Sequence, residues 1–300
     1  MDRKELLWTY AKLLMTALFW GGTFIAGRVV VRNVGPYSAS FLRFAIASVL
    51  LVGLTWRSEG RNRVLKAEHI LPVIVLGLTG VFAYNILFLK GLKLIEAGRA
   101  SMIIANNPIF IALCSAYFFK EKLTAVRLAG ILLSLSGAIV VIARGHFGNL
   151  FEGGIGRGEW LMFGCVASWV TYALVGKALM RSLKPLPAVT YSVLVGALAL
   201  SVPAYREGLT VQFVHFTVTD WLCLGYLGVF GTVFGFVWFY QGIQKIGAMR
   251  AGLFINFVPI SAVLLAFFIL GEPITPSLLI GAALVTVGVY LTNRTAPTLA

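Results

Sequence analysis

The feature that most constrains this chain is an internal repeat. The stretch from Phe88 to Ile142 returns, at a constant shift of 151 residues, as Phe239 to Asn293. In both copies an apolar segment carries a proline near its middle and ends before a lone glutamate, and a second apolar segment with glycines seven residues apart follows. The matched positions include Gly91 with Gly242, Ala97 with Ala248, Arg99 with Arg250, Pro108 with Pro259, Glu121 with Glu272, Gly130 with Gly281 and Gly137 with Gly288. Such a repeat is a structural unit that the chain uses twice.

The repeat also reaches the first part of the chain. At a shift of 149 residues, Trp20 matches Trp169 and Pro36 matches Pro185. We therefore expect a first repeat over residues 1–145, a linker over 146–156, a second repeat over 157–294 and a short tail over 295–300.

The composition indicates that the repeated unit lies in a membrane. Of the 300 residues, 59% are hydrophobic and 12% are charged, and a soluble domain of this size could not solvate such a surface. A membrane-spanning helix needs roughly 20 apolar residues. The expected fold class is therefore an all-α membrane protein with ten transmembrane helices, over residues 7–31, 37–56, 69–89, 98–119, 125–143, 159–180, 186–205, 218–243, 249–270 and 276–293.

The charge distribution predicts the orientation. In a soluble protein the net charge of +14 would suggest a nucleic-acid partner, but here Lys and Arg lie in short connections without interleaved aromatic stripes, so no nucleic acid is expected. With a cytoplasmic N-terminus, sixteen of the 25 basic residues fall inside and eight outside, while Arg43 lies within the segment 37–56. This excess predicts that both termini and the tail are cytoplasmic and that the linker is outside. We expect a multi-pass protein that is surrounded by lipid, in a bacterial inner membrane.

Five spans in each half make the two repeats inverted with respect to each other. An odd number of spans forces the second half to enter the membrane in the opposite sense, which is the architecture of many secondary transporters. These transporters hold a small-molecule substrate near the midplane, at the interface of the repeats. A chain that contains both repeats needs no second copy to complete the two-fold symmetry, so we expect a monomer.

The sequence offers little for chemical catalysis. The three cysteines lie in apolar runs without CxxC spacing, so neither a disulfide framework, a metal site nor a cofactor is expected. All eleven Asp and Glu residues and all three His residues fall in loops or near segment ends, which leaves no mid-membrane group to carry a proton. We expect no enzyme. Arg43, about six residues inside its segment, is expected to snorkel or to cap a neighbouring helix end.

Deep polar and aromatic side chains are the candidate substrate site, because such groups usually face protein or a cavity rather than lipid. Trp20 and Trp169 are too deep for an interfacial aromatic belt, although packing within the bundle is an alternative. Asn106 and Asn107 lie beside Pro108, which breaks the helix and frees a backbone carbonyl. They are expected to line the cavity, and the alternative role is hydrogen bonding between helices. The predicted substrate-binding residues are Trp20, Tyr84, Trp169, Tyr172 and Trp238 as aromatic walls and Asn85, Asn106, Asn107 and Asn256 as polar anchors, with Pro108 and Pro259 as bending points.

Taken in order, these landmarks resemble the EamA-type branch of the drug/metabolite transporter (DMT) superfamily over nearly the whole chain. The marks are Phe19-Trp20-Gly21-Gly22-Thr23-Phe24, Arg43-Phe44, Asn107-Pro108, Val258-Pro259, Glu121 and Gly271-Glu272. Within that branch the chain is similar to the YddG-type aromatic amino-acid exporters. The resemblance implies ten helices, alternating access and a central cavity formed chiefly by the segments 7–31, 69–89, 98–119, 159–180, 218–243 and 249–270.

Differences between this chain and other branches of the superfamily narrow the range of expected substrates. The small multidrug exporters bind cations through a glutamate in their first helix, which this chain lacks, and the late segments have no deep Lys or Arg such as phosphate-binding relatives use. Aromatic and amide groups suit an amphoteric solute with an apolar side chain, since rings stack and amides hold a carboxylate. We expect facilitated export of amino acids. Another small neutral metabolite or drug is the alternative, and a lipid-headgroup flippase or a membrane enzyme is a more distant one.

Overall fold

The structure, a computed structural model, describes residues 3–59, 65–119, 124–143, 155–180, 182–246, 251 and 254–293. These residues form helices and contain no strand, so the all-α expectation is confirmed for them. In the first half the helices are α1 (Arg3–Val30), α2 (Pro36–Glu59), α3 (Ala67–Leu76), η2 (Gly77–Ala83), α4 (Tyr84–Leu94), α5 (Ala97–Ile104), α6 (Asn107–Phe119) and α7 (Ala125–Ile142). In the second half they are α9 (Arg157–Leu179), α10 (Pro185–Arg206), α11 (Leu209–Gln212), η3 (Phe213–His215), α12 (Val218–Gly225), η4 (Tyr226–Phe234), α13 (Gly235–Ile246), α15 (Phe257–Leu265), η5 (Ala266–Leu270) and α16 (Pro276–Asn293).

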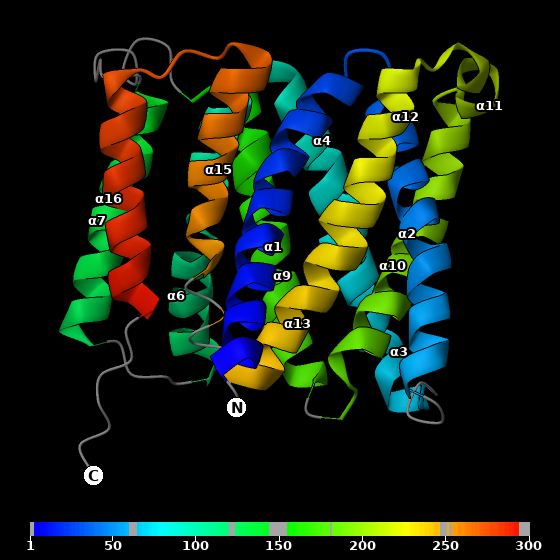
Figure 1. The fold of residues 1–300 in the computed structure, drawn as a ribbon, viewed down its shortest axis with the longest axis horizontal. Helices are drawn as coiled ribbons and strands as arrows, with labels where there is room; N and C mark the ends of the chain where they lie inside the picture. The colour runs from blue at the N-terminus through cyan, green and yellow to red at the C-terminus, as the bar shows by residue number, and fades with distance from the viewer. Residues whose placement is uncertain are drawn as a thin grey trace.

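The long helices run side by side as one bundle (Figure 1). Eight continuous helical stretches of the described chain are long and apolar enough to cross a membrane, and two shorter apolar helices, Phe257–Leu270 and Pro276–Thr292, follow them. The helical stretches fall where hydropathy predicts them. Their arrangement as ten spans in two inverted repeats stays a prediction, and the expected linker lies mostly outside the described residues.

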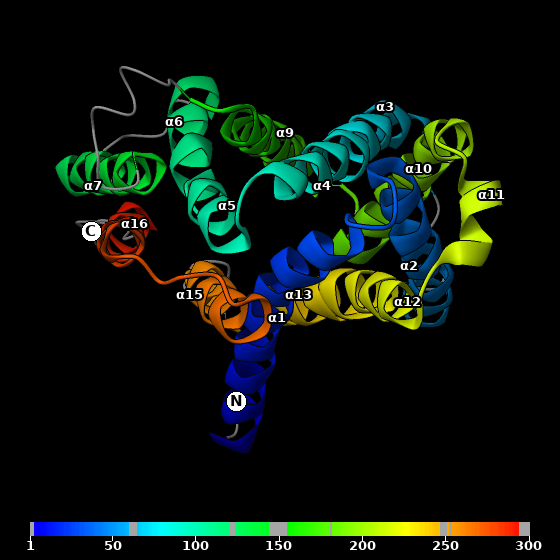
Figure 2. The same cartoon turned by 90° about the horizontal axis from the view of Figure 1, so that it is seen from above.

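Seen from above, the bundle is elongated (Figure 2). The pair α7 and α16 lies at one end, and α2, α10 and α11 lie at the other, so that α1, α4, α5, α9, α13 and α15 occupy the middle. The largest buried apolar cluster joins residues of α1, α4, α5, α9, η4 and α15. Helices from both halves of the sequence therefore share one core.

The repeat glycines bring α7 and α16 into close contact. A Cβ atom placed on Gly130 would lie 2.6 Å from the carbonyl oxygen of Gly288, and one on Gly137 would lie 2.8 Å from that of Gly281. Since glycine has no Cβ, the two backbones approach closely at both crossings. The seven-residue spacing noted in the sequence is thus a packing feature.

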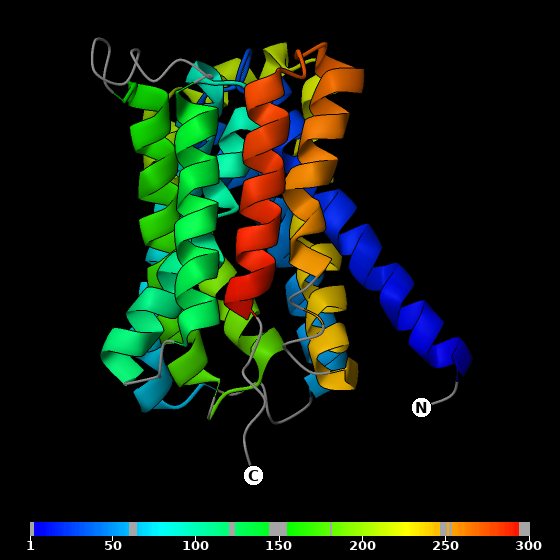
Figure 3. The same cartoon turned by 90° about the vertical axis from the view of Figure 1, so that its left-hand side faces the viewer.

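The beginning of α1 leaves the bundle. Figure 3 shows the N-terminal half of α1 leaning away from the other helices, and its Leu7 and Trp8 side chains are 59% and 68% exposed. Polar contacts to α13 include the ion pair of Glu5 with Lys245 at 2.7 Å and the hydrogen bond that Lys12 donates to the Gln241 side chain at 3.3 Å. The start of α1 and the end of α16 lie at the same end of the bundle (Figure 1).

Candidate functional site

Aromatic side chains from four central helices form a connected cluster. The ring of Trp20 on α1 lies 5.7 Å from that of Phe236 on α13, which lies 6.4 Å from that of Trp169 on α9. Trp169 in turn lies 5.4 Å from Tyr84 on α4 and stacks on Tyr172 at 5.2 Å. We call these five residues the aromatic cluster. It brings four of the five predicted aromatic walls together, and Phe236 is a member that the sequence reasoning missed.

Trp20 is anchored by a hydrogen bond as well as by ring contacts. Its indole Nε1 donates to the carbonyl oxygen of Gly231 in η4 at 3.0 Å, and its ring lies 5.3 Å from that of Phe239. A buried indole usually needs such a partner for its N–H. The bond fixes the orientation of the Trp20 ring within the cluster.

The two helices that carry Tyr84 and Phe236 each contain a π-helical segment. These segments, η2 and η4, are related by the internal repeat, because Gly77 and Gly80 match Gly228 and Gly231 at the same shift of 151 residues. π-helical turns in otherwise α-helical spans occur frequently at functional sites. The paired distortion therefore supports the central region as the site.

A buried arginine lies between the two π-helical segments. Arg43 of α2 is 7% exposed. Its Nη1 donates to the Asn85 side-chain oxygen at 2.8 Å, and its Nη2 donates to the Thr232 hydroxyl at 3.2 Å. The expectation that Arg43 snorkels or caps a helix end is wrong, because its guanidinium points to side chains of the bundle interior. The predicted polar anchor Asn85 is thus the partner of a charge that sequence reasoning did not assign to the site.

Asn106 lies at the break between α5 and α6 and is fully engaged there. Its amide nitrogen donates to the carbonyls of Met102 at 2.9 Å and Ile103 at 3.3 Å, and its oxygen accepts from the Ser134 hydroxyl at 2.8 Å. These bonds join the broken helix to α7. Such hydrogen bonding between helices is the role that the sequence predicts as the alternative to substrate binding.

The other two predicted asparagines also lie at helix interruptions. Asn107 begins α6 directly before Pro108, is 9% exposed, and has a buried side-chain oxygen without a hydrogen-bond partner. Asn256 is a partly exposed turn residue three positions before Pro259, at the start of α15. The substrate-binding role of the asparagines and the bending role of the prolines stay predictions.

Trp238 lies away from the aromatic cluster. Its ring contacts Phe19 at 5.7 Å and Phe234 at 5.2 Å, and the Lys12 ammonium lies 5.9 Å from its centroid. With Gln241 and other residues of α1 and α13 it lines a small hollow of about 50 Å³, near the end of the bundle where α1 begins. The substrate-binding role of Trp238 stays a prediction, and the structure places its ring at this hollow and not in the aromatic cluster.

Carboxylates tie the opposite end of the bundle together. Glu272, which precedes α16, accepts from the backbone N–H groups of Ala97 at 2.8 Å and Gly98 at 3.0 Å and pairs with Arg28 at 3.5 Å. Glu207 in the same way accepts from the Ser38 backbone N–H at 2.7 Å, at the start of α2. Both carboxylates thus stabilise helix N-termini, where a negative charge is favoured.

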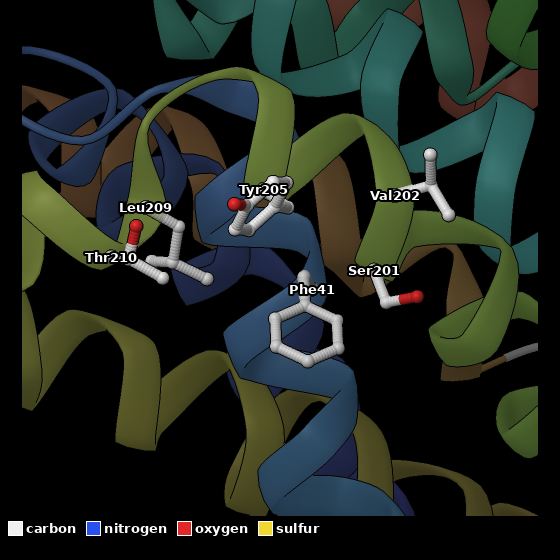
Figure 4. Close-up of a pocket in the computed structure, with 6 residues that line it drawn as sticks. All are labelled: Phe41, Ser201, Val202, Tyr205, Leu209 and Thr210. Atoms are coloured by element: carbon white, nitrogen blue, oxygen red, sulfur yellow. The ribbon is translucent and has the colours of Figure 1, made fainter.

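Another surface hollow lies on the outside of the bundle. It has a volume of about 420 Å³ and is lined by Phe41, Ser201, Val202, Tyr205, Leu209 and Thr210 (Figure 4). Tyr205 and Val202 are well exposed on the outside of α10. None of the predicted site residues lines this hollow, so we do not assign it to the substrate path.

Both halves of the chain are similar to known membrane transporters. The profile of the EamA-like transporter family matches the chain twice, over residues 7–143 and 156–294. The uncharacterized transporter YyaM of Bacillus subtilis is 29% identical over 280 residues, covering 93% of this chain and 92% of that protein. A probable terminal-alkyne amino-acid exporter of Streptantibioticus cattleyicolor is 30% identical over 286 residues, covering 94% of this chain and 92% of that protein.

A solved structure shares the fold. It is described as the crystal structure of a protein, and it matches with a TM-score of 0.65 over 97% of this chain and 96% of its own, at 20% sequence identity. This likeness concerns the arrangement of helices alone.

Proposed function

The chain belongs to the EamA-like transporter family, and from this premise we propose that it exports amino acids with aromatic or other apolar side chains across the bacterial inner membrane. It is a membrane transporter of the DMT superfamily. What we propose beyond the family is the substrate, the direction of transport and the membrane in which the protein lies.

The observation that carries this proposal is the aromatic cluster. Its rings come from α1, α4, α9 and α13, so both halves of the sequence contribute to it. In transporters built from inverted repeats the substrate site lies where the two repeats meet. Aromatic faces in such a place can stack on an apolar or aromatic side chain and can hold an ammonium group.

One relative supports the amino-acid class. The exporter of Streptantibioticus cattleyicolor carries amino-acid export in its name and aligns with nearly the whole of this chain. We propose amino acids as the substrate class of this chain, without the restriction to side chains that carry a terminal alkyne. The aromatic cluster offers the same kind of surface to any apolar side chain.

We further propose ten spans in two inverted repeats, with both termini cytoplasmic and with alternating access about the cluster. The repeat, the excess of basic residues in the inner segments, and the position of the start of α1 and the end of α16 at one end of the bundle support this arrangement. The proposed points of bending are Pro108 and Pro259, which follow the helix breaks at Asn106 and Asn256. We propose that the protein works as a monomer.

Two other functions are compatible with the family. Export of another small neutral metabolite or drug would use the same cluster, while a lipid-headgroup flippase or an enzyme would need further groups. Among the described residues no group of three or more His, Cys, Asp and Glu side chains could hold a metal ion. The relative that is named as an amino-acid exporter favours the amino-acid substrate over these alternatives.

The substrate class is tested with purified protein in proteoliposomes. Vesicles are loaded with labelled phenylalanine, glucose or tetraethylammonium, and the initial rate of efflux of each is measured against protein-free vesicles. The proposal requires efflux of phenylalanine well above that of the sugar and the cation. Equal movement of all three solutes, or no movement of phenylalanine, would contradict it.

A further inference from the structure

Arg43 is a buried positive charge to which the described part of the chain supplies no carboxylate. Both side chains that accept its hydrogen bonds, Asn85 and Thr232, are neutral. The ion pairs of the described residues do not include it, and its Nε is buried without a hydrogen-bond partner. A buried charge costs free energy unless an opposite charge compensates it.

Two other arginines of the bundle, Arg99 and Arg28, do have a carboxylate partner. Arg99, 8% exposed, pairs with Glu159 at 2.9 Å and donates to the carbonyl of Ile142. Arg28, at the end of α1, pairs with Glu272 at 3.5 Å. The chain therefore neutralises Arg28 and Arg99 internally and leaves Arg43 without such a partner.

The guanidinium of Arg43 is nevertheless held in a defined position. Both amide protons of Asn85 are directed to backbone carbonyls, of Gly80 at 3.2 Å and Val81 at 2.8 Å, so its oxygen is left to face Arg43. The Thr232 hydroxyl donates to the Leu227 carbonyl at 2.9 Å and is likewise left to accept. The two π-helical segments thus orient the charge without neutralising it, which is how a preorganised binding group is built.

Arg43 also lies next to the aromatic cluster. A Cβ atom placed on Gly231 would be 3.6 Å from Nη2 of Arg43, and the carbonyl of Gly231 accepts the indole hydrogen of Trp20. Asn85 directly follows Tyr84, another member of the cluster. A solute with an aromatic ring on one side and a negative group on the other matches this juxtaposition.

We propose that Arg43 binds the carboxylate of the transported solute, which supplies the counter-charge that the described residues do not. The inference rests on the proposed function, since it names the group that recognises one end of the amino acid. Arginine suits this role because its planar guanidinium donates paired hydrogen bonds to a carboxylate. The alternative is that Arg43 only joins α2 to α4 and η4.

Three ligands that share one ring separate these roles. Phenylalanine has a carboxylate and an ammonium group, 3-phenylpropionate has only the carboxylate, and 2-phenylethylamine has only the ammonium group. Binding of each to the full-length protein in detergent is measured by tryptophan fluorescence. In Arg43→Gln the affinity for phenylalanine and 3-phenylpropionate is expected to fall about tenfold or more, while that for 2-phenylethylamine is unchanged.

A second variant tests the same point with Arg43 kept in place. Asn85→Asp puts a carboxylate of the same shape where the amide oxygen accepts from Arg43, so it provides an internal counter-charge. It is expected to weaken binding of both carboxylate ligands and to spare 2-phenylethylamine. Arg28→Gln removes a positive charge at the end of the bundle and is the matched control, with all three affinities unchanged.

The outcomes separate this inference from the proposed function. Equal loss of all three ligands in both variants, unchanged binding of the two carboxylates, or a wild-type protein that binds neither carboxylate would overturn the role of Arg43. If phenylalanine is exported but Arg43→Gln keeps its affinity, the proposed function stands and this inference fails. If 3-phenylpropionate binds through Arg43 but no amino acid is exported, the inference stands and the proposed function fails.

Discussion

Trp20 and Gly231, which are 211 residues apart in the sequence, are joined by a hydrogen bond of 3.0 Å from the indole Nε1 to the backbone carbonyl. The bond ties the middle of α1 to a π-helical segment of the second repeat. The same glycine lies beside Arg43, since a Cβ on it would approach Nη2 to 3.6 Å. One position therefore connects the aromatic cluster, the distorted helix and the buried charge.

This bond predicts a specific effect of Trp20→Phe. The substitution keeps an aromatic ring but removes the indole donor, so the free energy of unfolding should fall by about 1 kcal/mol. Thermal unfolding in detergent measures it. Trp160→Phe is the control, because the Trp160 side chain is 61% exposed and should show no such change. An equal effect of the two substitutions would mean that the bond to Gly231 contributes nothing.

The close contact of α7 and α16 predicts that its glycines tolerate no side chain. In Gly130→Ala the new methyl group would lie 2.6 Å from the carbonyl oxygen of Gly288, and such overpacking costs about 1–3 kcal/mol. Gly53→Ala on α2 meets nothing within 4 Å, so it should be neutral or stabilise by about 0.5–1 kcal/mol. The two variants are compared by thermal unfolding, and loss of stability in both would contradict the assigned contact.

Glu272 should stabilise the end of the bundle opposite to the start of α1. Glu272→Gln weakens the charged hydrogen bonds to Ala97 and Gly98 and the ion pair with Arg28, which should cost about 1–3 kcal/mol. Glu68, with a side chain 63% exposed and a partner at 3.8 Å in Lys66, is the matched control, and Glu68→Gln should change stability by less than about 0.5 kcal/mol. Chemical denaturation of the purified variants measures the difference, and equal midpoints would refute the role given to Glu272.

Transport should be independent of a proton gradient. The buried carboxylates of the described residues, Glu159 and Asp220, lie in the first turns of α9 and α12, where Arg99 and the Thr217 backbone engage them. Both therefore lie at helix ends, whereas a proton carrier needs a titratable group deep within the membrane. Phenylalanine efflux from proteoliposomes is expected to have the same rate with and without a pH difference. Accumulation of phenylalanine against its gradient, driven by pH, would refute this.

Helix positions could be predicted from the sequence because apolar length and punctuation determine them. The expected segment 186–205 is observed as Pro185–Arg206, where a proline suits the first helical turn and a charged residue follows the apolar run. The π-helical segments could not be predicted. They depend on partners from other helices, such as Trp20 for the carbonyl of Gly231, and a single helix sequence does not contain that information.

The site was predicted in part, for reasons of helix geometry. Trp20, Tyr84 and Trp169 were found because depth alone singles out large polar aromatics. The sequence prediction places Trp238 with these residues. In the structure Trp238 is two positions from Phe236 and therefore on nearly the opposite face of α13, about 200° away at 3.6 residues per turn. The distance of Arg43 from the helix end predicts a snorkelling or capping role. That distance does not reveal that Asn85 and Thr232 accept hydrogen bonds from Arg43 in the interior.

The most direct test of the account is the initial rate of phenylalanine efflux from proteoliposomes with wild type, Trp169→Ala and Trp160→Ala. Both substitutions remove a tryptophan from α9, but Trp169 lies in the aromatic cluster, whereas Trp160 is 61% exposed and contacts Phe163. Efflux by wild type and Trp160→Ala at similar rates, with loss of efflux in Trp169→Ala, is the expected result. Equal efflux by all three proteins would contradict the claim that the aromatic cluster binds the exported amino acid.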